Sequence, residues 1–229
     1  VMFELLTSQE VATLLGVSLR QVSNLRREGH VVAVADGVYD RASVLRVRNA
    51  RAAHRQRAWT ERTAWQAIAI TAGVEAHFIG QTQRSRLKAA LRLMEAETFV
   101  SLVRDRARVH RVTGHRRSAH RIAAELVNTG TAAARLGLTS AAVRIDGYAT
   151  IAEVELILER YHLGQATGSD DAAVLRAVSE VSRSDVERIN TAGDLLAALS
   201  LAESLDDRER SAGLDYIGSA LGDRLAHAS

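Results

Sequence analysis

The segment LTSQEVATLLGVSLRQVSNLRREGHVVAVADGVYDRASV, from Leu6 to Val44, holds the signals of two short helices, a tight turn and a hairpin in succession. Thr7 and Glu10 have the spacing of a capping box, in which each side chain accepts a hydrogen bond from the backbone amide of the other. A helix is therefore expected to begin at Ser8. It is expected to end at Gly16, because glycine readily adopts the left-handed C-cap conformation.

The same capping pattern predicts a second helix. Ser18 and Gln21 repeat the spacing, and the helix would run from about residue 19 to residue 28 with Val22 and Leu25 turned inward. Its outer face would carry Arg20, Gln21, Ser23, Asn24 and Arg27.

A hairpin and a third helix are expected next. Apolar residues at 31–34 and 38–39 flank Asp36 and Gly37, and Asp-Gly is a strong signal for a tight hairpin turn. Asp40 then has the position of an N-cap for a helix that begins near Arg41.

This order of helix, turn, helix, hairpin and capped helix resembles the winged helix-turn-helix of MerR-type regulators and phage excisionases, over roughly the first 45 residues. In that motif the N-terminal end of the second helix faces the base pairs. Arginine pairs with guanine in the major groove, and asparagine or glutamine pairs with adenine. The resemblance implies base contacts for Arg20, Gln21 and Asn24, and phosphate contacts for Ser18, Ser23 and Arg27. The alternative is a helical hairpin that merely packs and happens to be polar outside.

Charge is distributed unevenly along the chain. The net charge is +3, but residues 1–125 carry 21 basic and 11 acidic side chains, whereas residues 126–229 carry 9 basic and 16 acidic ones. The front half therefore suits a polyanion, and the acidic back half suits a protein partner or self-association.

Two runs of arginine dominate the front half. The first contains Arg41, Arg46, Arg48, Arg51, Arg55, Arg57 and Arg62, and the second contains Arg104, Arg106, Arg108, Arg111, Arg116, Arg117 and Arg121. Because the first run follows the hairpin directly, Arg41, Arg46, Arg48 and Arg51 are expected to contact DNA phosphates, although a solvated helix face is the alternative. The second run could bind DNA, or dock an acidic surface of the chain itself or of a partner.

The overall pattern predicts a mostly α fold in three regions. Residues 1–50 would form the winged helix-turn-helix, residues 51–125 an Arg-rich helical region, and residues 126–229 a small acidic α+β domain. In the middle region, Thr60 would cap a helix, and residues 85–94 have helical spacing. In the last region we expect a strand at 142–145 that ends in a turn at 146–148, a helix over 151–161 capped by Thr150 and stopped by Gly164, a strand at 173–178, and helices over 192–204 and 208–225.

No pattern in the sequence indicates an enzyme, a metal or a cofactor. Gly168–Asp171 has a Gly-Ser pair followed by carboxylates, as in nucleotidyltransferases, but the further strand carboxylates of those enzymes are absent, and a loop is expected. His110, His115 and His120 are five residues apart, which would scatter them around a helix. There is no cysteine, so disulfides and thiolate sites are excluded. Without a long apolar window or a signal-peptide pattern, the protein is expected in the cytoplasm, with no membrane partner.

A broader family resemblance comes from the two ends of the chain. The winged helix, the Arg-rich middle, the Asp146-Gly147-Tyr148 turn before a capped helix, and the closing segments 196–204 and 207–214 together resemble actinobacterial proteins related to the AbiE-type antitoxins. Such proteins are typically encoded beside a nucleotidyltransferase-fold toxin. The resemblance implies a repressor that binds inverted repeats in its own promoter, as a possible homodimer on double-stranded DNA, and whose C-terminal part counters the toxin.

Two other functions remain open at the level of the sequence. One is an excisionase-like recombination or DNA-architecture factor, which rests on the likeness of residues 6–44 alone. The other is a toxin-like nucleotidyltransferase, which rests on residues 168–171 alone.

Overall fold

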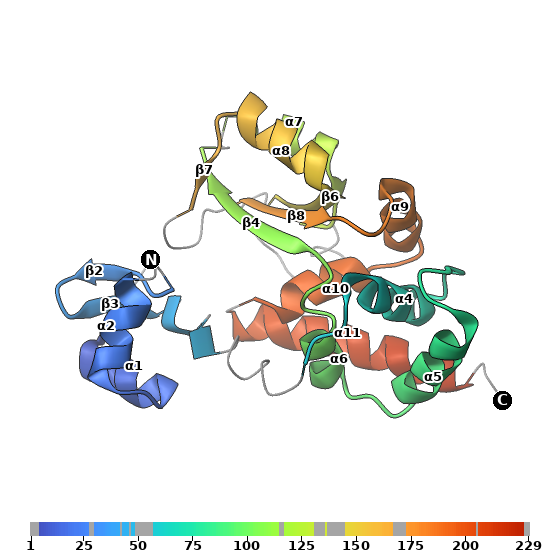
Figure 1. The fold of residues 1–229 in the computed structure, drawn as a ribbon, viewed down its shortest axis with the longest axis horizontal. Coiled ribbons are helices and arrows are strands. Elements are labelled where there is room, and N and C mark those ends of the chain that lie inside the picture. Colours follow the sequence, from blue (N-terminus) through green and yellow to red (C-terminus); the bar gives the residue numbers. More distant parts are fainter. Residues whose placement is uncertain are drawn as a thin grey trace. The chain divides into compact units, whose positions relative to one another are not determined.

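The chain forms two compact units in a computed structural model that describes residues 5–27, 30–41, 43–45, 47–48, 57–114, 117–130, 136, 145–166, 173–204 and 206–226. Of the described residues, the N-terminal unit contains those up to residue 48 together with Ala166, and the C-terminal unit contains those from 57 to 165 and from 173 to 226 (Figure 1). Helices make up most of the described residues, and the strands lie in two small sheets. The fold is therefore mostly α with an α+β part, as expected.

The N-terminal unit pairs two helices with a three-stranded sheet. Its elements are β1 (Leu5–Thr7), α1 (Ser8–Leu15), α2 (Leu19–Arg27), β2 (Ala33–Ala35) and β3 (Val38–Asp40), and residues 41, 43–45 and 47–48 are helical. The sheet order is β1-β3-β2, and both pairings are antiparallel. The expected helices and hairpin are confirmed. The strand β1 was not anticipated, and it places Leu6 opposite Tyr39.

Local capping fixes the bounds of these helices. The Thr7 amide donates to Glu10 Oε2 at 2.7 Å, and the Glu10 amide donates to Thr7 Oγ1 at 3.3 Å, which completes the capping box. Gly16 ends α1 in the left-handed conformation with φ of 62°. The Ser43 amide donates to Asp40 Oδ2 at 2.8 Å, so Asp40 caps the following helical residues as predicted. The expected end of the second helix at Glu28 lies outside the described residues.

An apolar core joins the two helices to the sheet. It consists of the buried side chains Val11, Ala12, Val22, Leu25, Val31, Tyr39 and Val44. Val22 and Leu25 are the two buried positions of α2, as the spacing predicted. The opposite face of α2 is thereby left outside the core.

The C-terminal unit is built around a five-stranded sheet with helices on both faces. Its elements are α4 (Glu61–Ala72), α5 (Gln81–Leu91), α6 (Ala96–Leu102), β4 (Arg108–Thr113), α7 (Ala119–Glu125), β5 (Val127–Asn128), β6 (Asp146–Thr150), α8 (Ile151–Arg160), β7 (Gly164–Gln165), β8 (Ala173–Val178), α9 (Arg183–Thr191), α10 (Leu195–Ala202) and α11 (Asp207–Ala226). The strand order is β5-β6-β8-β4-β7, in which only β6 and β8 are parallel.

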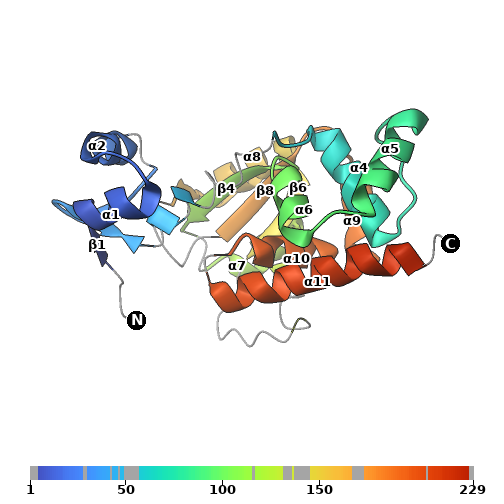
Figure 2. The same ribbon diagram turned by 90° about the horizontal axis from the view of Figure 1, so that it is seen from below.

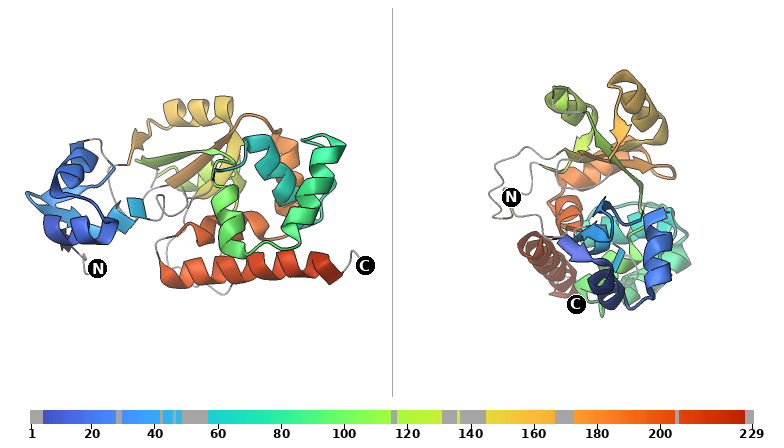
Figure 3. Two further views of the ribbon diagram at one scale, coloured as in Figure 1. Left: turned by 60° about the horizontal axis from the view of Figure 1, so that its bottom comes forward. Right: turned by 90° about the vertical axis from the view of Figure 1, so that its left-hand side faces the viewer.

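Side chains along the central strands point alternately to the two faces of the sheet, and a separate apolar core covers each face. Ala173, Leu175 and Ala177 of β8 face a core with apolar residues of α7 and α8, whereas Val178 belongs to a larger core with α4, α10 and α11. Figure 3 shows α8 in yellow on one side of the strands and the red α11 on the other. Trp65 of α4 is fully buried in the larger core, and the partly buried Trp59 packs against it.

The sheet corrects the predicted division of the chain at residue 125. The strand β4 comes from the Arg-rich region that was expected to be helical, and it pairs with β8 from Arg108 opposite Ala177 to Val112 opposite Ala173. Residues 57–125 and the acidic region therefore share one unit. The error arose because arginine and histidine at positions 108, 110 and 111 hid the alternation of this strand, of which only Val112 is buried.

The same correction applies to the histidines. His110 lies in β4 and His120 lies in α7, so they do not lie around one helix as predicted, and His115 lies outside the described residues.

The predicted turn at Asp146-Gly147-Tyr148 is also wrong, because these residues begin β6. A Cβ at Gly147 would lie 2.8 Å from the Val127 carbonyl oxygen and 2.9 Å from Leu126 Cβ. Glycine is needed there for the close approach of β5 and not for a turn. Of the strand expected at 142–145, only Ile145 is described, and it is not in a strand.

Several C-terminal predictions are confirmed and a few need adjustment. Thr60 caps α4, Thr150 forms a capping box with Glu153, and β8, α10 and α11 lie where they were expected. The helix α8 ends at Arg160, and Gly164 belongs to β7, so glycine does not stop this helix. The helix α9, with Ser182 as its N-cap, was not anticipated. Gly168–Asp171 lies outside the described residues.

The two closing helices pack backbone against backbone. A Cβ at Gly213 of α11 would lie 2.5 Å from the Ala198 carbonyl oxygen and 2.5 Å from the Ala202 amide nitrogen of α10. Figure 2 shows α11 running alongside α10 and α6. This crossing needs a residue without a side chain.

We predict that Gly213→Ala lowers the free energy of unfolding by about 1–3 kcal/mol, because the added methyl group must push the two helices apart. The matched control is Gly218→Ala in the same helix, where a Cβ would have nothing within 4 Å. That change should raise stability by roughly 0.5–1 kcal/mol, because alanine favours a helix over glycine. Urea unfolding measures both, and equal effects would contradict the close crossing.

Candidate nucleic-acid interface

The outward face of α2 presents a continuous polar stripe. Arg20, Ser23, Asn24 and Arg27 are spaced i, i+3, i+4 and i+7, which places them on one side of a helix. Arg20, Ser23 and Arg27 are exposed and Asn24 is half-buried, while Val22 and Leu25 hold the other side in the core. The structure therefore brings together four of the residues predicted to contact DNA.

Ser18 and Gln21 also cap the start of this helix. Gln21 Oε1 accepts from the Ser18 amide at 3.0 Å and from Ser18 Oγ at 3.3 Å, and the Gln21 amide donates to Ser18 Oγ at 3.3 Å. Bidentate pairing with adenine uses both the oxygen and the nitrogen of a side-chain amide. Because the oxygen of Gln21 is engaged in the cap, its side-chain nitrogen is the group left to donate to DNA.

Asn24 and Arg27 contact each other within the stripe. Arg27 Nη2 donates to Asn24 Oδ1 at 3.1 Å, one helical turn away. This contact holds the carboxamide of Asn24 with its nitrogen away from the guanidinium. Such an orientation leaves an amide donor and part of the guanidinium available on the same face.

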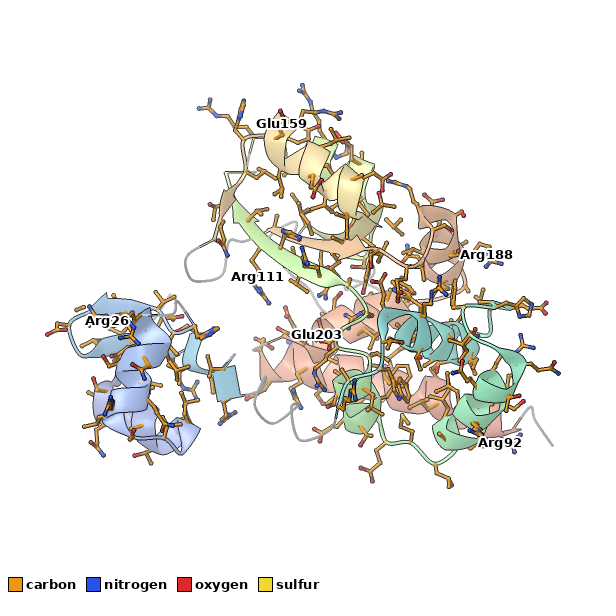
Figure 4. All side chains as sticks on the ribbon, in the orientation of Figure 1. Arg26, Arg92, Arg111, Glu159, Arg188 and Glu203 are labelled. Atoms are coloured by element: carbon orange, nitrogen blue, oxygen red, sulfur yellow. The ribbon has the colours of Figure 1, made fainter. Side chains whose placement is uncertain are left out.

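A salt bridge links α2 to the hairpin. Arg26 Nη1 lies 3.1 Å from Asp36 Oδ1, and the side chain of Asp36 is fully exposed at the hairpin turn (Figure 4). Arg26 is not among the contacts predicted from the sequence. Asp36 lies ten residues after Arg26 in the sequence, and the two side chains meet only because the hairpin folds back on the helix.

The carboxylates of this unit are all engaged locally. Among the described residues 5–48, Glu10 completes the α1 cap, Asp36 pairs with Arg26, and Asp40 caps the helical residues after β3. The hydrogen bonds from the Thr7 amide and hydroxyl lower the pKa of Glu10, so it stays ionised in the cap. Arg20 and Arg48 are exposed and have no carboxylate partner in the described part of the chain. The unit therefore offers unpaired positive charge on α2 and after β3.

The remaining predicted contacts are only partly described. Arg41 and Arg48 are exposed and lie among the helical residues after β3. Arg46 and Arg51 lie outside the described side chains. One apolar residue was missed by the sequence analysis, since Leu19 at the start of α2 is 51% exposed beside Arg20. An apolar side chain at this end of a recognition helix can contact a thymine methyl group.

The second arginine run contributes a buried residue to the C-terminal unit. Arg106 is 1% exposed, and its Nη1 lies 2.5 Å from Glu203 Oε1, while its Nε donates to the Tyr148 hydroxyl at 2.8 Å. Figure 4 labels Glu203 just beyond α10. The second arginine run was predicted either to bind DNA or to dock onto an acidic surface, and Arg106 docks onto an acidic group of the chain itself. Arg108, Arg117 and Arg121 are exposed instead.

Arg176 of β8 completes this buried charge cluster, which we call the Glu203 cluster (Arg106, Asp146, Tyr148, Arg176 and Glu203). Arg176 Nε and Nη2 bind Asp146 through both carboxylate oxygens at 2.7 and 3.0 Å, and its Nη1 donates to Glu203 Oε2 at 2.8 Å. The guanidinium also lies 5.8 Å from the centre of the Tyr148 ring. Burial alone would raise the pKa of Glu203, but the charges of Arg106 and Arg176 outweigh it and lower the pKa to about 2.

Charged groups of the C-terminal unit pair with each other in the Glu203 cluster and at a hollow beside α9. The carboxylates of the cluster are occupied by arginine, and no group of histidines and carboxylates suited to a metal ion occurs among the described residues. A shallow hollow of about 490 Å³ beside α9 is lined by Glu75, His77, Asp185 and Arg188. Its charged side chains pair with each other, with Arg188 2.8 Å from Asp185 and His77 3.5 Å from Glu75.

We predict that Glu203→Gln lowers stability at pH 7 by about 3–5 kcal/mol, because it leaves the buried guanidinium of Arg106 without a counter-charge and leaves Arg176 with Asp146 alone. The folded-state pKa of Glu203 is depressed, so its stabilisation is present above pH 4.5 and is lost as the pH falls towards 2. The difference between wild type and Glu203→Gln should therefore shrink as the pH falls from about 5. Glu97→Gln, which breaks the exposed pair with Arg210, is the control and should cost less than about 1 kcal/mol. Denaturant unfolding at several pH values tests this, and a difference independent of pH would contradict it.

Nothing in the described part of the chain forms a helix of the length and apolar character that a membrane crossing requires. Comparisons with family models, with characterised proteins and with solved structures found no match to this chain.

Proposed function

We propose that this protein is a sequence-specific DNA-binding transcriptional repressor whose N-terminal unit is a winged helix-turn-helix. The observation that carries this proposal is the exposed stripe of Arg20, Ser23, Asn24 and Arg27 on a helix whose other face lies in the core. A helical hairpin that merely packs would also leave this face polar, but here Arg20 is exposed with no carboxylate partner in the described part of the chain. The helices, the hairpin and the capped residues after it follow the order that the motif requires.

Within this proposal, the residues have different roles. Arg20 would bind guanine through two hydrogen bonds, and Asn24 would read adenine. Ser23 and Arg27 would contact phosphates beside them, and Arg41, Arg46, Arg48 and Arg51 would add contacts that do not depend on sequence. Gln21 would donate to the DNA through its side-chain nitrogen, and Ser18 would donate to a phosphate once its hydroxyl turns away from Gln21 Oε1. The exposed Leu19 would contact the methyl group of a thymine.

We further propose that the protein is the antitoxin of a toxin-antitoxin pair, which represses its own promoter in the cytoplasm. The support is the resemblance of its two ends to AbiE-type antitoxins, together with a C-terminal unit that is too large for a linker and whose later part, residues 126–229, has an excess of acidic side chains. This unit has two cores of its own. Its size favours the repressor over an excisionase-like factor, because excisionase modules usually stand nearly alone. The partners would be double-stranded operator DNA, bound by a homodimer, and a nucleotidyltransferase-type toxin.

We predict that Arg20→Ala or Asn24→Ala reduces the discrimination between operator and random DNA by about 1–3 kcal/mol, because each removes a contact to a base edge. Arg48→Ala should weaken binding to both DNAs alike, since a phosphate contact carries no sequence information. Fluorescence titrations with the upstream intergenic region and a scrambled duplex measure both effects. Equal losses on the two DNAs for Arg20→Ala and Asn24→Ala would refute the base-reading roles.

Toxin neutralisation requires a separate test with the full chain. The neighbouring toxin is expressed from an unrelated promoter, so repression cannot protect the cells. We predict that the double variant Arg20→Ala/Asn24→Ala still restores growth as well as the wild type, because the C-terminal unit would act on the toxin. Loss of rescue in this variant would place neutralisation in the DNA-binding unit, and no rescue by the wild type would remove the antitoxin role.

A further inference from the structure

The helix α5 of the C-terminal unit carries a concentration of positive charge that the roles above do not use. Its sequence QTQRSRLKAAL, followed by Arg92, contains four cations, and no carboxylate occurs between Glu75 and Glu95. Leu87 and Leu91 are its only buried residues, and they anchor the helix in the larger core. Figure 4 shows Arg92 at the end of this helix.

The stability of the helix does not explain these charges. Arg84, Lys88 and Arg92 are spaced i, i+4 and i+8, and like charges at this spacing repel each other. The first turn has no acidic residue, and Gly80 provides no side-chain cap, so nothing balances the arginines of the N-terminal half. The helix α5 forms despite this repulsion and the missing cap. We therefore interpret its cations as placed for an external partner and not for the stability of the helix.

The positions of the cations define a surface. With Leu87 and Leu91 facing the core, Lys88 and Arg92 lie on one flank of the helix and Arg86 lies on the other. The side chains between them on the outer crest are small, namely Thr82, Ser85 and Ala89. Arg86, Lys88 and Arg92 are exposed, and no carboxylate pairs with them in the described part of the chain. Arg84 is different, because it contacts His77 and the Ala76 carbonyl oxygen.

We propose that α5 is a second DNA-binding surface, which holds the phosphates of a duplex through Arg86, Lys88 and Arg92 without reading the bases. Small side chains on the crest let the helix approach a phosphate backbone closely, and cations on both flanks neutralise it. A protein partner would be expected to bind around aromatic or large apolar anchors. Within α5 the exposed positions carry no apolar side chain larger than alanine, and Leu93, which follows Arg92, is a single apolar side chain that is 92% exposed. The inference rests on DNA as the ligand of the chain, but it does not depend on sequence reading by α2.

The test uses the full chain and a duplex of random sequence. In the triple variant Arg86→Ala/Lys88→Ala/Arg92→Ala, the slope of log affinity against log salt should fall by about 2–3, because each lost phosphate contact releases about one counterion less. The control is Arg160→Ala/Arg188→Ala/Arg210→Ala, which changes the net charge equally at arginines that already pair with Glu125, Asp185 and Glu97. Its slope should change by less than half as much.

Further measurements separate the alternatives. The charge-preserving variant Arg86→Lys/Arg92→Lys should keep the wild-type slope, and the triple variant should melt no lower than the wild type because it removes like-charge repulsion. Equal slopes for the triple variant and the control would overturn the inference, as would a wild type that binds no duplex. Salt-dependent self-association that disappears in the triple variant, with DNA binding unchanged, would assign α5 to an acidic surface of a second copy instead. Loss of the discrimination between operator and random DNA, with an unchanged salt slope, would concern the base contacts of α2 and would not contradict this inference.

Discussion

The carboxylate of Glu203, held between the guanidiniums of Arg106 and Arg176, is the interaction on which the C-terminal unit depends. It joins the segment before β4 to β8 and to the end of α10, and Asp146 extends it to β6. The Trp65 indole donates to the Arg106 carbonyl oxygen at 2.8 Å, which adds α4 to the same junction. Charges taken out of water are tolerated only when each has a partner, so these five segments must be in place together. The cluster therefore favours one arrangement of the sheet and its helices over others that would bury as much apolar surface.

The two units use arginine in opposite ways. The C-terminal unit pairs many of its arginines with carboxylates, both in the Glu203 cluster and at surface pairs such as Arg160 with Glu125. In the N-terminal unit, the described carboxylates instead cap helices or, for Asp36, pair with Arg26. Arg20 and Arg48 are exposed there without a carboxylate partner in the described part of the chain. The helix α5 resembles the N-terminal unit in this respect. Net charge alone does not reveal this difference, because it depends on which charges have partners.

The sequence predicted the features that are encoded locally. The capping boxes at Thr7 and Thr150, the left-handed Gly16 and the inward pair on α2 all involve residues within four positions of each other. The misplaced features depend on distant contacts. The strand β4 has a single buried position, and its pairing with β8 joins residues more than 60 positions apart. Gly147 was predicted to lie in a turn, because its neighbours in the sequence do not reveal that β5 passes close to it. Arg106 looked like its exposed neighbours, since its partner Glu203 is almost 100 residues away.

The salt bridge between Arg26 and the hairpin has an implication for how the N-terminal unit would meet a polyanion. Asp36 is a tethered counterion, fixed to the chain and fully exposed beside the helix that we propose faces DNA. A phosphate that took its place on Arg26 would lose its condensed cation, but the freed carboxylate would take up a cation in turn. Such an exchange would be nearly independent of ionic strength, unlike the contacts of Arg20 and Arg48. It would also remove the attachment of the hairpin turn to the helix, while Tyr39 stays packed in the core, so that arrival of the ligand would loosen one internal contact as it forms an external one.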